Sequence, residues 1–166
     1  MVSDKTVADI IGRRKQLLTI ESTSCVAEAA RKMADGQVGS LVVLGAAGET
    51  VGIITERDIL NKVVACGLDP QTTDVETIMT PSVISVGWFT PFNEAQRLMT
   101  IHRIRHLLVT DGGAVVGIVS AKDMLRTSLA ACETIIRKQA KVLQDLESQH
   151  PGITQIKTDR AGRVLI

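Results

Sequence analysis

Short apolar runs alternate with segments of helical spacing along the first part of the chain. Three runs are mostly apolar or β-branched, which is typical of buried strands: residues 17–20, 40–44 and 51–54. Residues 24–34 place Val26, Ala29 and Met33 on one face of a predicted helix. A second helix is predicted over 56–66, ended by Gly67. This order of elements is strand, helix, strand, strand, helix.

The same order returns later in the chain. The residues Val-Gly-Ile-Ile-Thr-Glu-Arg-Asp at 51–58 return as Val-Gly-Ile-Val-Ser-Ala-Lys-Asp at 116–123, and Leu41-Val-Val matches Leu107-Leu-Val. The second copy predicts strands over 83–86, 106–110 and 115–119, a helix over 91–101 and a turn at 111–113. We therefore expect an α/β (α+β) fold of two β-α-β-β-α repeats, with a first domain at 6–68, a second at 73–129, and a C-terminal helix and tail at 130–166.

Composition excludes several classes of protein. The 166 residues are 45% hydrophobic and 2% aromatic, with a net charge of +1. That hydrophobic fraction is too high for a disordered chain, and the near-neutral charge argues against a nucleic-acid partner. The longest apolar run, 41–48, is too short to span a membrane, and no targeting segment is evident. Cys25, Cys66 and Cys132 suit buried structural thiols in a reducing cytoplasm. Together with the short apolar runs, they lead us to expect a cytoplasmic protein with no membrane partner.

The repeated pattern ends each strand with a hydroxyl residue and places an aspartate three residues later. Thr55 with Asp58, and Ser120 with Asp123, have the form of helix capping boxes, as does Thr6 with Asp9. The same arrangement also suits a nucleotide. A helix N-terminus favours phosphate, and a carboxylate one turn further on can accept both hydroxyls of a ribose. A cap is the simpler reading of one copy, but a copy at the matching position of each of the two repeats favours a binding site.

The chain resembles a tandem pair of CBS domains, a Bateman module. The resemblance covers residues 6–129 and rests on the two motifs above and on Val-Glu-Thr-Ile-Met-Thr-Pro at 75–81. It implies pseudo-two-fold packing of the repeats, clefts for adenosine nucleotides between them, and a disc-shaped homodimer of two modules. It also implies a stand-alone regulatory protein with no chemistry of its own, no required cofactor, no catalytic residue and no metal.

The resemblance assigns roles to individual residues. Asp58 and Asp123 would bind ribose hydroxyls. Phosphate contacts would come from Thr55, Ser120, Arg57 and Lys122. Adenine would lie against Thr19, Ile20 and Val38 in the first site and against Ser85, Val86 and Ile104 in the second.

The two repeats differ in charge at one segment. His-Arg-Ile-Arg-His at 102–106 aligns with Gly-Gln-Val-Gly-Ser at 36–40. We expect Arg105 and His106 to join the second site, which would then hold phosphates more tightly and fill unequally with the first. The alternative is a solvated basic turn. A metal between His102 and His106 is disfavoured, because a metal needs neutral imidazoles and two arginines lie beside them.

Residues from Ser120 onward predict one long helix, stopped at 150–152. Its apolar residues alternate spacings of four and three, with Gln139 as a polar member of the seam: Leu125, Leu129, Cys132, Ile136, Gln139, Leu143 and Leu146. Two interpretations of this seam remain open: the helix pairs with another helix, or it packs on its own module. Residues 153–166 predict a small hairpin, whose apolar end at 164–166 suits packing on a partner subunit.

These features favour a module that binds AMP, ADP, ATP or S-adenosylmethionine and regulates a separate, unidentified protein. A ligand-independent scaffold for protein interaction or dimerisation is the alternative. A nucleotide-processing enzyme is a third reading, for which no Walker loop, nucleophile elbow or metalloprotease motif is present.

Overall fold

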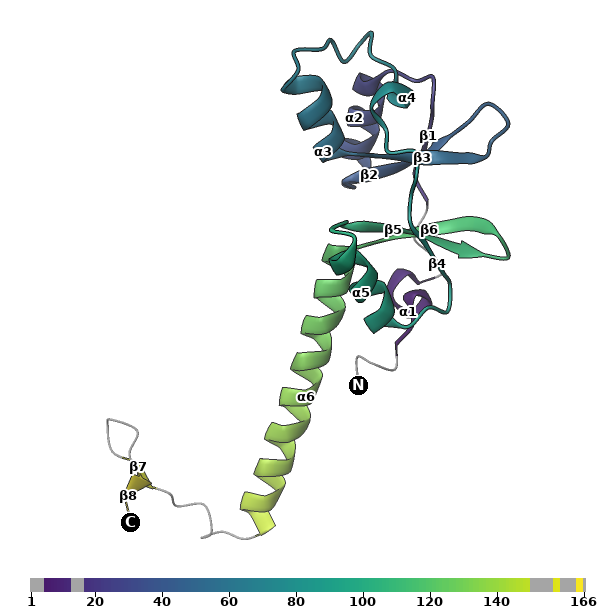
Figure 1. The fold of residues 1–166 in the computed structure, drawn as a ribbon. Coiled ribbons are helices and arrows are strands. Elements are labelled where there is room, and N and C mark those ends of the chain that lie inside the picture. Colours follow the sequence, from purple (N-terminus) through teal and green to yellow (C-terminus); the bar gives the residue numbers. More distant parts are fainter. Residues whose placement is uncertain (1–4, 13–16, 150–156, 159–163, 166) are drawn as a thin grey trace. The chain divides into compact units, whose positions relative to one another are not determined.

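A computed structural model describes residues 5–12, 17–149, 157–158 and 164–165 of the chain (Figure 1). The chain divides into two compact units, Met1–Met124 and Leu125–Ile166. The first unit holds both repeats, and the second holds most of the long helix and the tail.

The first repeat forms a three-stranded mixed sheet. Strand β1 (Thr19–Glu21) pairs in parallel with β2 (Ser40–Leu44), which pairs antiparallel with β3 (Thr50–Thr55). Helix α2 (Val26–Gly36) connects the two parallel strands, as such a connection requires. These bounds confirm the predicted elements to within two residues.

The second helix of this repeat is less regular than its spacing predicts. An α-helical turn, α3 (Glu56–Asp58), passes into a π-helical segment, η2 (Ile59–Val64). Gly67 then takes a φ of +67°, which ends the helix where a glycine was expected to end it. The segment buries Val63 in the first core and leaves Leu60 and Val64 exposed.

The second repeat copies the first. Its elements are β4 (Ser85–Gly87), α5 (Phe92–Ile101), β5 (His106–Asp111), β6 (Ala114–Ser120) and the start of α6 (Ala121–Gln149). Thr19 pairs with Val42 in the first sheet as Ser85 pairs with Leu108 in the second, and both hairpins contain an irregularity at equivalent positions. The hairpin of the second sheet is one residue shorter, which changes the offset between the copies from 66 to 65.

Two short helices add an apolar side chain to each core. Helix α4 (Val75–Ile78) packs its valine into the first core, and α1 (Val7–Ile11) packs Val7 into the second core. The backbone bonds are equivalent: Val75 N donates to Ser24 O and Val7 N donates to Thr90 O, both at 2.9 Å. The N-terminal segment therefore completes the second repeat, although it precedes the first in the sequence.

Each sheet buries both of its faces. One face carries Leu41 and Val43 in the first repeat, or Leu107 and Val109 in the second, into a core shared with the helices. On the other face, Val42, Ile53 and Leu108 are also buried but belong to neither core. The two sheets of the first unit face each other in Figure 1. Two repeats that are marginal alone thus share apolar surface.

The second unit begins at Leu125, within α6. The tail contributes β7 (Lys157–Thr158) and β8 (Val164–Leu165), which pair antiparallel and confirm the expected hairpin. The predicted helix stop at 150–152 lies outside the described residues. No helix in the described part of the chain combines the length and the apolar character that crossing a membrane requires.

The cysteines depart from the expectation of burial. Cys25 is partly buried, whereas Cys66 and Cys132 are exposed. Cys66 follows η2, where its thiol donates to the carbonyl of Asn61, and Cys132 lies within α6. Thiol spacing in the sequence does not report which face of a helix a residue occupies.

Candidate functional site

The two strand-to-helix junctions have the same hydrogen-bond geometry. At the end of β3, Thr55 Oγ1 donates to Asp58 Oδ2 at 2.6 Å and Thr55 N donates to the same oxygen at 3.0 Å. At the end of β6, the hydroxyl of Ser120 donates to Asp123 Oδ2, and Ser120 N donates to it at 2.9 Å. In return, Asp58 N and Asp123 N donate to the two hydroxyl oxygens. The sequence pattern predicted both pairs.

These contacts are also those of a capping box. The motif therefore caps a helix in both repeats. Thr6 and Asp9 make the same box at the start of α1, with Thr6 Oγ1 to Asp9 Oδ2 at 2.9 Å. The hydrogen bonds from Thr6 lower the pKa of the Asp9 carboxyl below its usual value. Asp9 is exposed at the surface, whereas Asp58 and Asp123 are partly buried at sheet ends. Location, rather than hydrogen bonding, distinguishes the two repeated pairs.

The register places Ser40 and three predicted site residues, Thr19, Ser85 and His106, relative to the sheet faces. Ser40 pairs with Thr55 and His106 pairs with Ser120, so paired side chains lie on one side of their sheet. Thr19 and Ser85 pair with Val42 and Leu108, on the faces where the two sheets meet. Because His106 pairs with Ser120, it lies beside the second junction.

Not every predicted adenine contact reaches this face. Ile20 belongs to the first core and Val86 to the second, so their side chains point toward the helices. Alternation along a strand sends neighbours to opposite faces, so these two residues offer only backbone atoms on the side of Thr19 and Ser85. Val38 and Ile104 are partly buried against the first and second cores.

The connections from helix to strand have matching backbones and different charges. Gln37 and Arg103, at equivalent positions, both take the left-handed conformation, with φ of +50° and +53°. Val38 N donates to Met33 O, and Ile104 N donates to Met99 O, both at 3.0 Å. This shared geometry fixes the aligned positions in space, so the basic segment of the second repeat occupies the place of a neutral one in the first.

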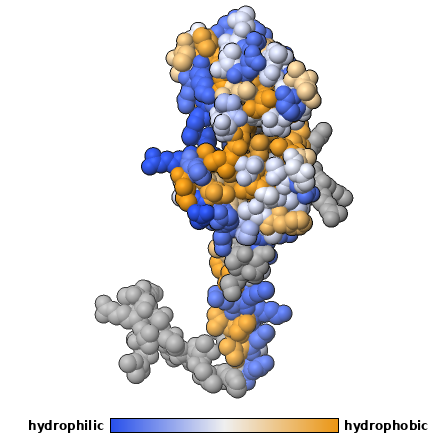
Figure 2. Space-filling model, turned by 45° about the vertical axis from the view of Figure 1, so that its right-hand side comes forward, coloured by the Kyte–Doolittle hydropathy of each residue, from blue (hydrophilic) through white to orange (hydrophobic). Residues whose placement is uncertain are grey.

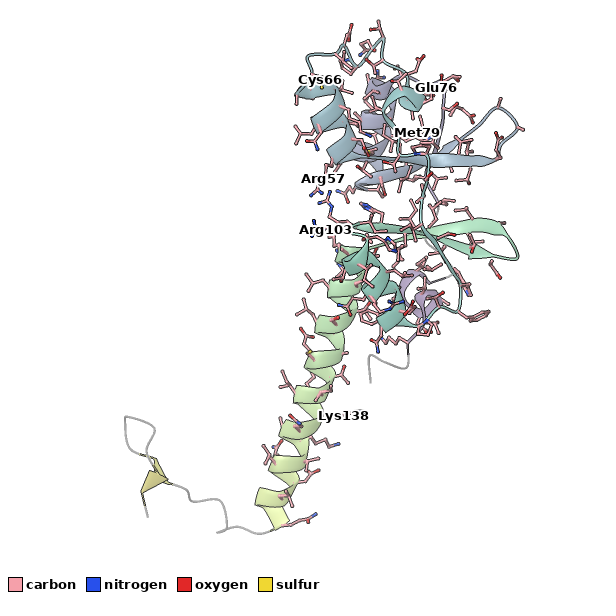
Figure 3. The ribbon with its side chains drawn as sticks, viewed as in Figure 1. Arg57, Cys66, Glu76, Met79, Arg103 and Lys138 are labelled. Carbon is pink, nitrogen blue, oxygen red and sulfur yellow. The ribbon has the colours of Figure 1, made fainter. Side chains whose placement is uncertain are left out.

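Arg103 is a site candidate that the sequence-based list left out. In Figure 3, Arg57 and Arg103 lie on the same edge of the first unit.

Among the described residues, no group of three or more His, Cys, Asp or Glu side chains could hold a metal.

The first junction carries two charged residues that the second lacks. Lys62 Nζ contacts Asp58 Oδ1 at 2.8 Å and donates to Ile78 O at 2.6 Å, while the Asp58 side chain is only 13% exposed. The residue equivalent to Lys62 in the second repeat is Thr127, and Glu56 is replaced by Ala121. An alignment of the two repeats shows that both charged residues are replaced. The bond from Lys62 to Ile78 O of α4 is visible only in three dimensions.

The net charge therefore differs between the junctions. Glu56 and Asp58 offset Arg57 and Lys62 in the first, whereas Arg103, Arg105 and Lys122 exceed Asp123 by two charges in the second.

Comparison with known proteins defines the class of this chain. The sequence model of the CBS domain matches residues 7–65 and 75–130. The chain belongs to the CBS-domain family and carries two CBS domains, which confirms the resemblance.

Individual relatives agree. An uncharacterized protein of Methanopyrus kandleri is 36% identical over 134 residues, which cover 80% of this chain and 68% of that protein. The structure of a protein with CBS domains from Burkholderia ambifaria, proposed to act in signal transduction, has a TM-score of 0.71 at 36% identity and covers 76% of this chain and 95% of that one. A CBS domain protein from Pyrobaculum aerophilum, solved in complex with AMP, has a TM-score of 0.65 at 28% identity, covering 72% and 89%. CBS-domain proteins are regulatory, signal-transduction modules.

Proposed function

We propose that this chain is a regulatory module that binds an adenosine nucleotide at the two strand-to-helix junctions. Asp58 and Asp123 accept the ribose hydroxyls, and Thr55 and Ser120 donate to phosphate. The AMP complex of the Pyrobaculum aerophilum relative supports this class of ligand. The observation that carries the proposal is the repeated hydroxyl–carboxylate pair, present twice in the same register.

The aspartates are suited to this role because their bonds are local. Each carboxylate accepts from a hydroxyl and an amide only three residues away. A ribose can compete for such an oxygen without unfolding the helix, since a cap contributes only about 1 kcal/mol. Aliphatic side chains and strand backbone would hold the adenine, which agrees with an aromatic content of 2%.

The second site is proposed to bind phosphate-rich nucleotides more tightly than the first. Arg103, Arg105 and Lys122 give it a surplus of two positive charges once Asp123 is counted. In the first site, Lys62 already contacts one oxygen of Asp58. ATP or ADP would then fill the second site before the first, in keeping with the basic segment at 102–106.

Regulation is proposed to follow from differential binding. A nucleotide shifts a conformational equilibrium only when it binds one state better than another. The chain would pass that shift to a separate protein, and a homodimer of modules would combine the response of two copies. Its own residues would supply binding groups and perform no reaction.

The alternative is a ligand-independent scaffold. The exposed apolar residues of α6 favour it, because they suit a protein contact whether or not a nucleotide is bound.

Calorimetric titration of the full chain with AMP, ADP, ATP and S-adenosylmethionine tests the proposal. We expect saturable binding of an adenosine nucleotide, tighter for ATP than for AMP. GTP serves as the control for the base, and chromatography of the recovered nucleotide checks that it is unchanged. No binding of any adenosine compound would favour the scaffold. Conversion of the nucleotide to a product would favour an enzyme.

Arg103→Gly is expected to lower the affinity for ATP about tenfold, because one charge-assisted contact is worth about 1.5 kcal/mol. Glycine adopts the positive φ of this position without strain, so the unfolding free energy should change by less than about 1 kcal/mol. Calorimetry with ATP and with adenosine, beside urea denaturation, measures both effects.

Gln37→Gly is the matched control, since it changes the same backbone position in the first repeat without removing a charge. It should leave ATP binding at the second site unaltered. An equal loss of adenosine and ATP affinity in Arg103→Gly would contradict a phosphate contact.

A further inference from the structure

Helix α6 exposes an apolar stripe beyond the second repeat. Seven large side chains on it are 46–64% exposed: Leu125, Leu129, Ile135, Ile136, Val142, Leu143 and Leu146. Figure 2 shows apolar and hydrophilic residues gathered on different sides of this helix. Within residues 125–146, which the structure describes throughout, every charged residue falls outside the stripe. A soluble helix with such segregation is typical of one that packs against another element.

The spacing of the stripe identifies its partner as a helix. Leu125, Leu129, Cys132, Ile136, Gln139, Leu143 and Leu146 follow one another at alternating steps of four and three. This is the a and d pattern of a coiled coil, with Ile135 and Val142 flanking it at g positions. We propose that α6 pairs with α6 of a second copy of this chain, in parallel and in register. The proposal does not rest on nucleotide binding.

Gln139 determines the direction of the pair. In a parallel, in-register dimer, each layer contains the same residue from both helices, so the Gln139 amide meets its counterpart and the two can bond. In an antiparallel pair, a positions face d positions, and Gln139 would face an apolar side chain such as Ile136 or Leu143. An amide left without a partner at a buried position is destabilising. The parallel register also places Ile135 beside the small side chain of Ala140.

The area of the stripe approaches the area that a stable dimer buries. Full burial of a leucine-sized side chain removes roughly 100 Å² of apolar surface. Seven half-exposed side chains on each of two copies therefore remove on the order of 700 Å². Homodimer interfaces are about 65% apolar, which gives a total of about 1,100 Å². That is close to the lower limit of about 1,200 Å² for stable interfaces.

Cys132 is a native reporter of this arrangement, because it occupies the seam and is exposed. Facing Cα atoms of paired helices fall within the separation of about 4.4–6.8 Å that a disulfide needs. The test uses the full chain with Cys25→Ser and Cys66→Ser, so that Cys132 is the only thiol. We expect mild oxidation to yield a covalent dimer on a non-reducing gel, from a protein that sediments as a dimer.

Two matched variants keep the test decisive. Moving the thiol to the polar face, with Cys132→Ser and Lys138→Cys, should slow cross-linking at least tenfold; Lys138 projects from α6 in Figure 3. Ile136→Glu with Leu143→Glu should abolish cross-linking at Cys132, whereas Lys138→Glu should not. Circular dichroism confirms that each variant stays folded. A monomeric protein, a dimer whose Cys132 does not cross-link, or equal rates from positions 132 and 138 would each overturn the proposal.

Discussion

Asp123→Ala is expected to weaken ATP binding at the second site by on the order of 100-fold. The carboxylate would lose two charge-assisted hydrogen bonds to the ribose, each worth about 1.5 kcal/mol or more. Their loss of about 3 kcal/mol corresponds to roughly two orders of magnitude in affinity. Calorimetry should show the stronger phase of binding removed and the weaker phase retained.

Asp58→Ala should have the complementary effect. It removes the weaker phase and leaves the stronger one, because the first site lacks the basic segment and Lys62 already contacts Asp58. Equal losses in the two variants would contradict the unequal sites.

Asp9→Ala separates binding from helix capping. Asp9 accepts the same two bonds from Thr6 as the site aspartates accept from their hydroxyl residues, at 2.8 and 2.9 Å, but it lies on α1. We expect unaltered affinity for ATP in this variant. A loss comparable with that of Asp123→Ala would show that the aspartates act through folding rather than through contact with the nucleotide.

Gly52→Ala is expected to lower the unfolding free energy by about 3 kcal/mol. A Cβ at this position would lie 2.7 Å from Thr80 O and 2.9 Å from Met79 Sδ. The Thr80 backbone cannot retreat easily, because Ile53 N and Thr80 O are bonded at 3.0 Å and Thr80 N and Ile53 O at 2.9 Å. Overpacking against fixed backbone lies at the upper end of the usual 1–3 kcal/mol. Urea denaturation measures the change.

Gly117→Ala is the control at the equivalent position of the second sheet. Its Cβ would meet Ile11 Cδ1 at 3.2 Å, which is the end of a flexible side chain. The expected change is below about 1 kcal/mol, because the side chain can turn aside. Similar destabilisation in both variants would mean that the strand position itself, and not the segment at 79–80, excludes a side chain.

The features that the sequence predicted well are those encoded over a few neighbouring residues. The strand at 40–44 has the predicted bounds, because a continuous apolar run with β-branched residues suits a buried strand. The pairs Thr55–Asp58 and Ser120–Asp123 were also predicted, because a capping box spans only three residues. The offset between the repeats also located the basic segment at 102–106.

The features that the sequence did not predict depend on contacts between distant residues. Thr19 and Ile20 were both expected to contact adenine, but the pleat of β1 turns Ile20 into the core. The bond from Lys62 to Ile78 joins two residues 16 positions apart, in different helices. The π-helical form of η2 was also not evident, since an apolar face at helical spacing does not distinguish 3.6 residues per turn from a slightly wider coil.

By itself, the sequence determined the two repeats, the order of their strands and helices, the family, and the hydroxyl–carboxylate pairs, because periodicity and capping act locally. The tertiary structure alone decided that α1 completes the second core, that Gly52 must accommodate the backbone of Thr80, and that Lys62 donates to Ile78 O of α4. The reason is physical: a helix joins whichever apolar surface remains uncovered, and a charge pairs with whichever group the fold brings within reach. Neither choice is written in the spacing of neighbouring residues.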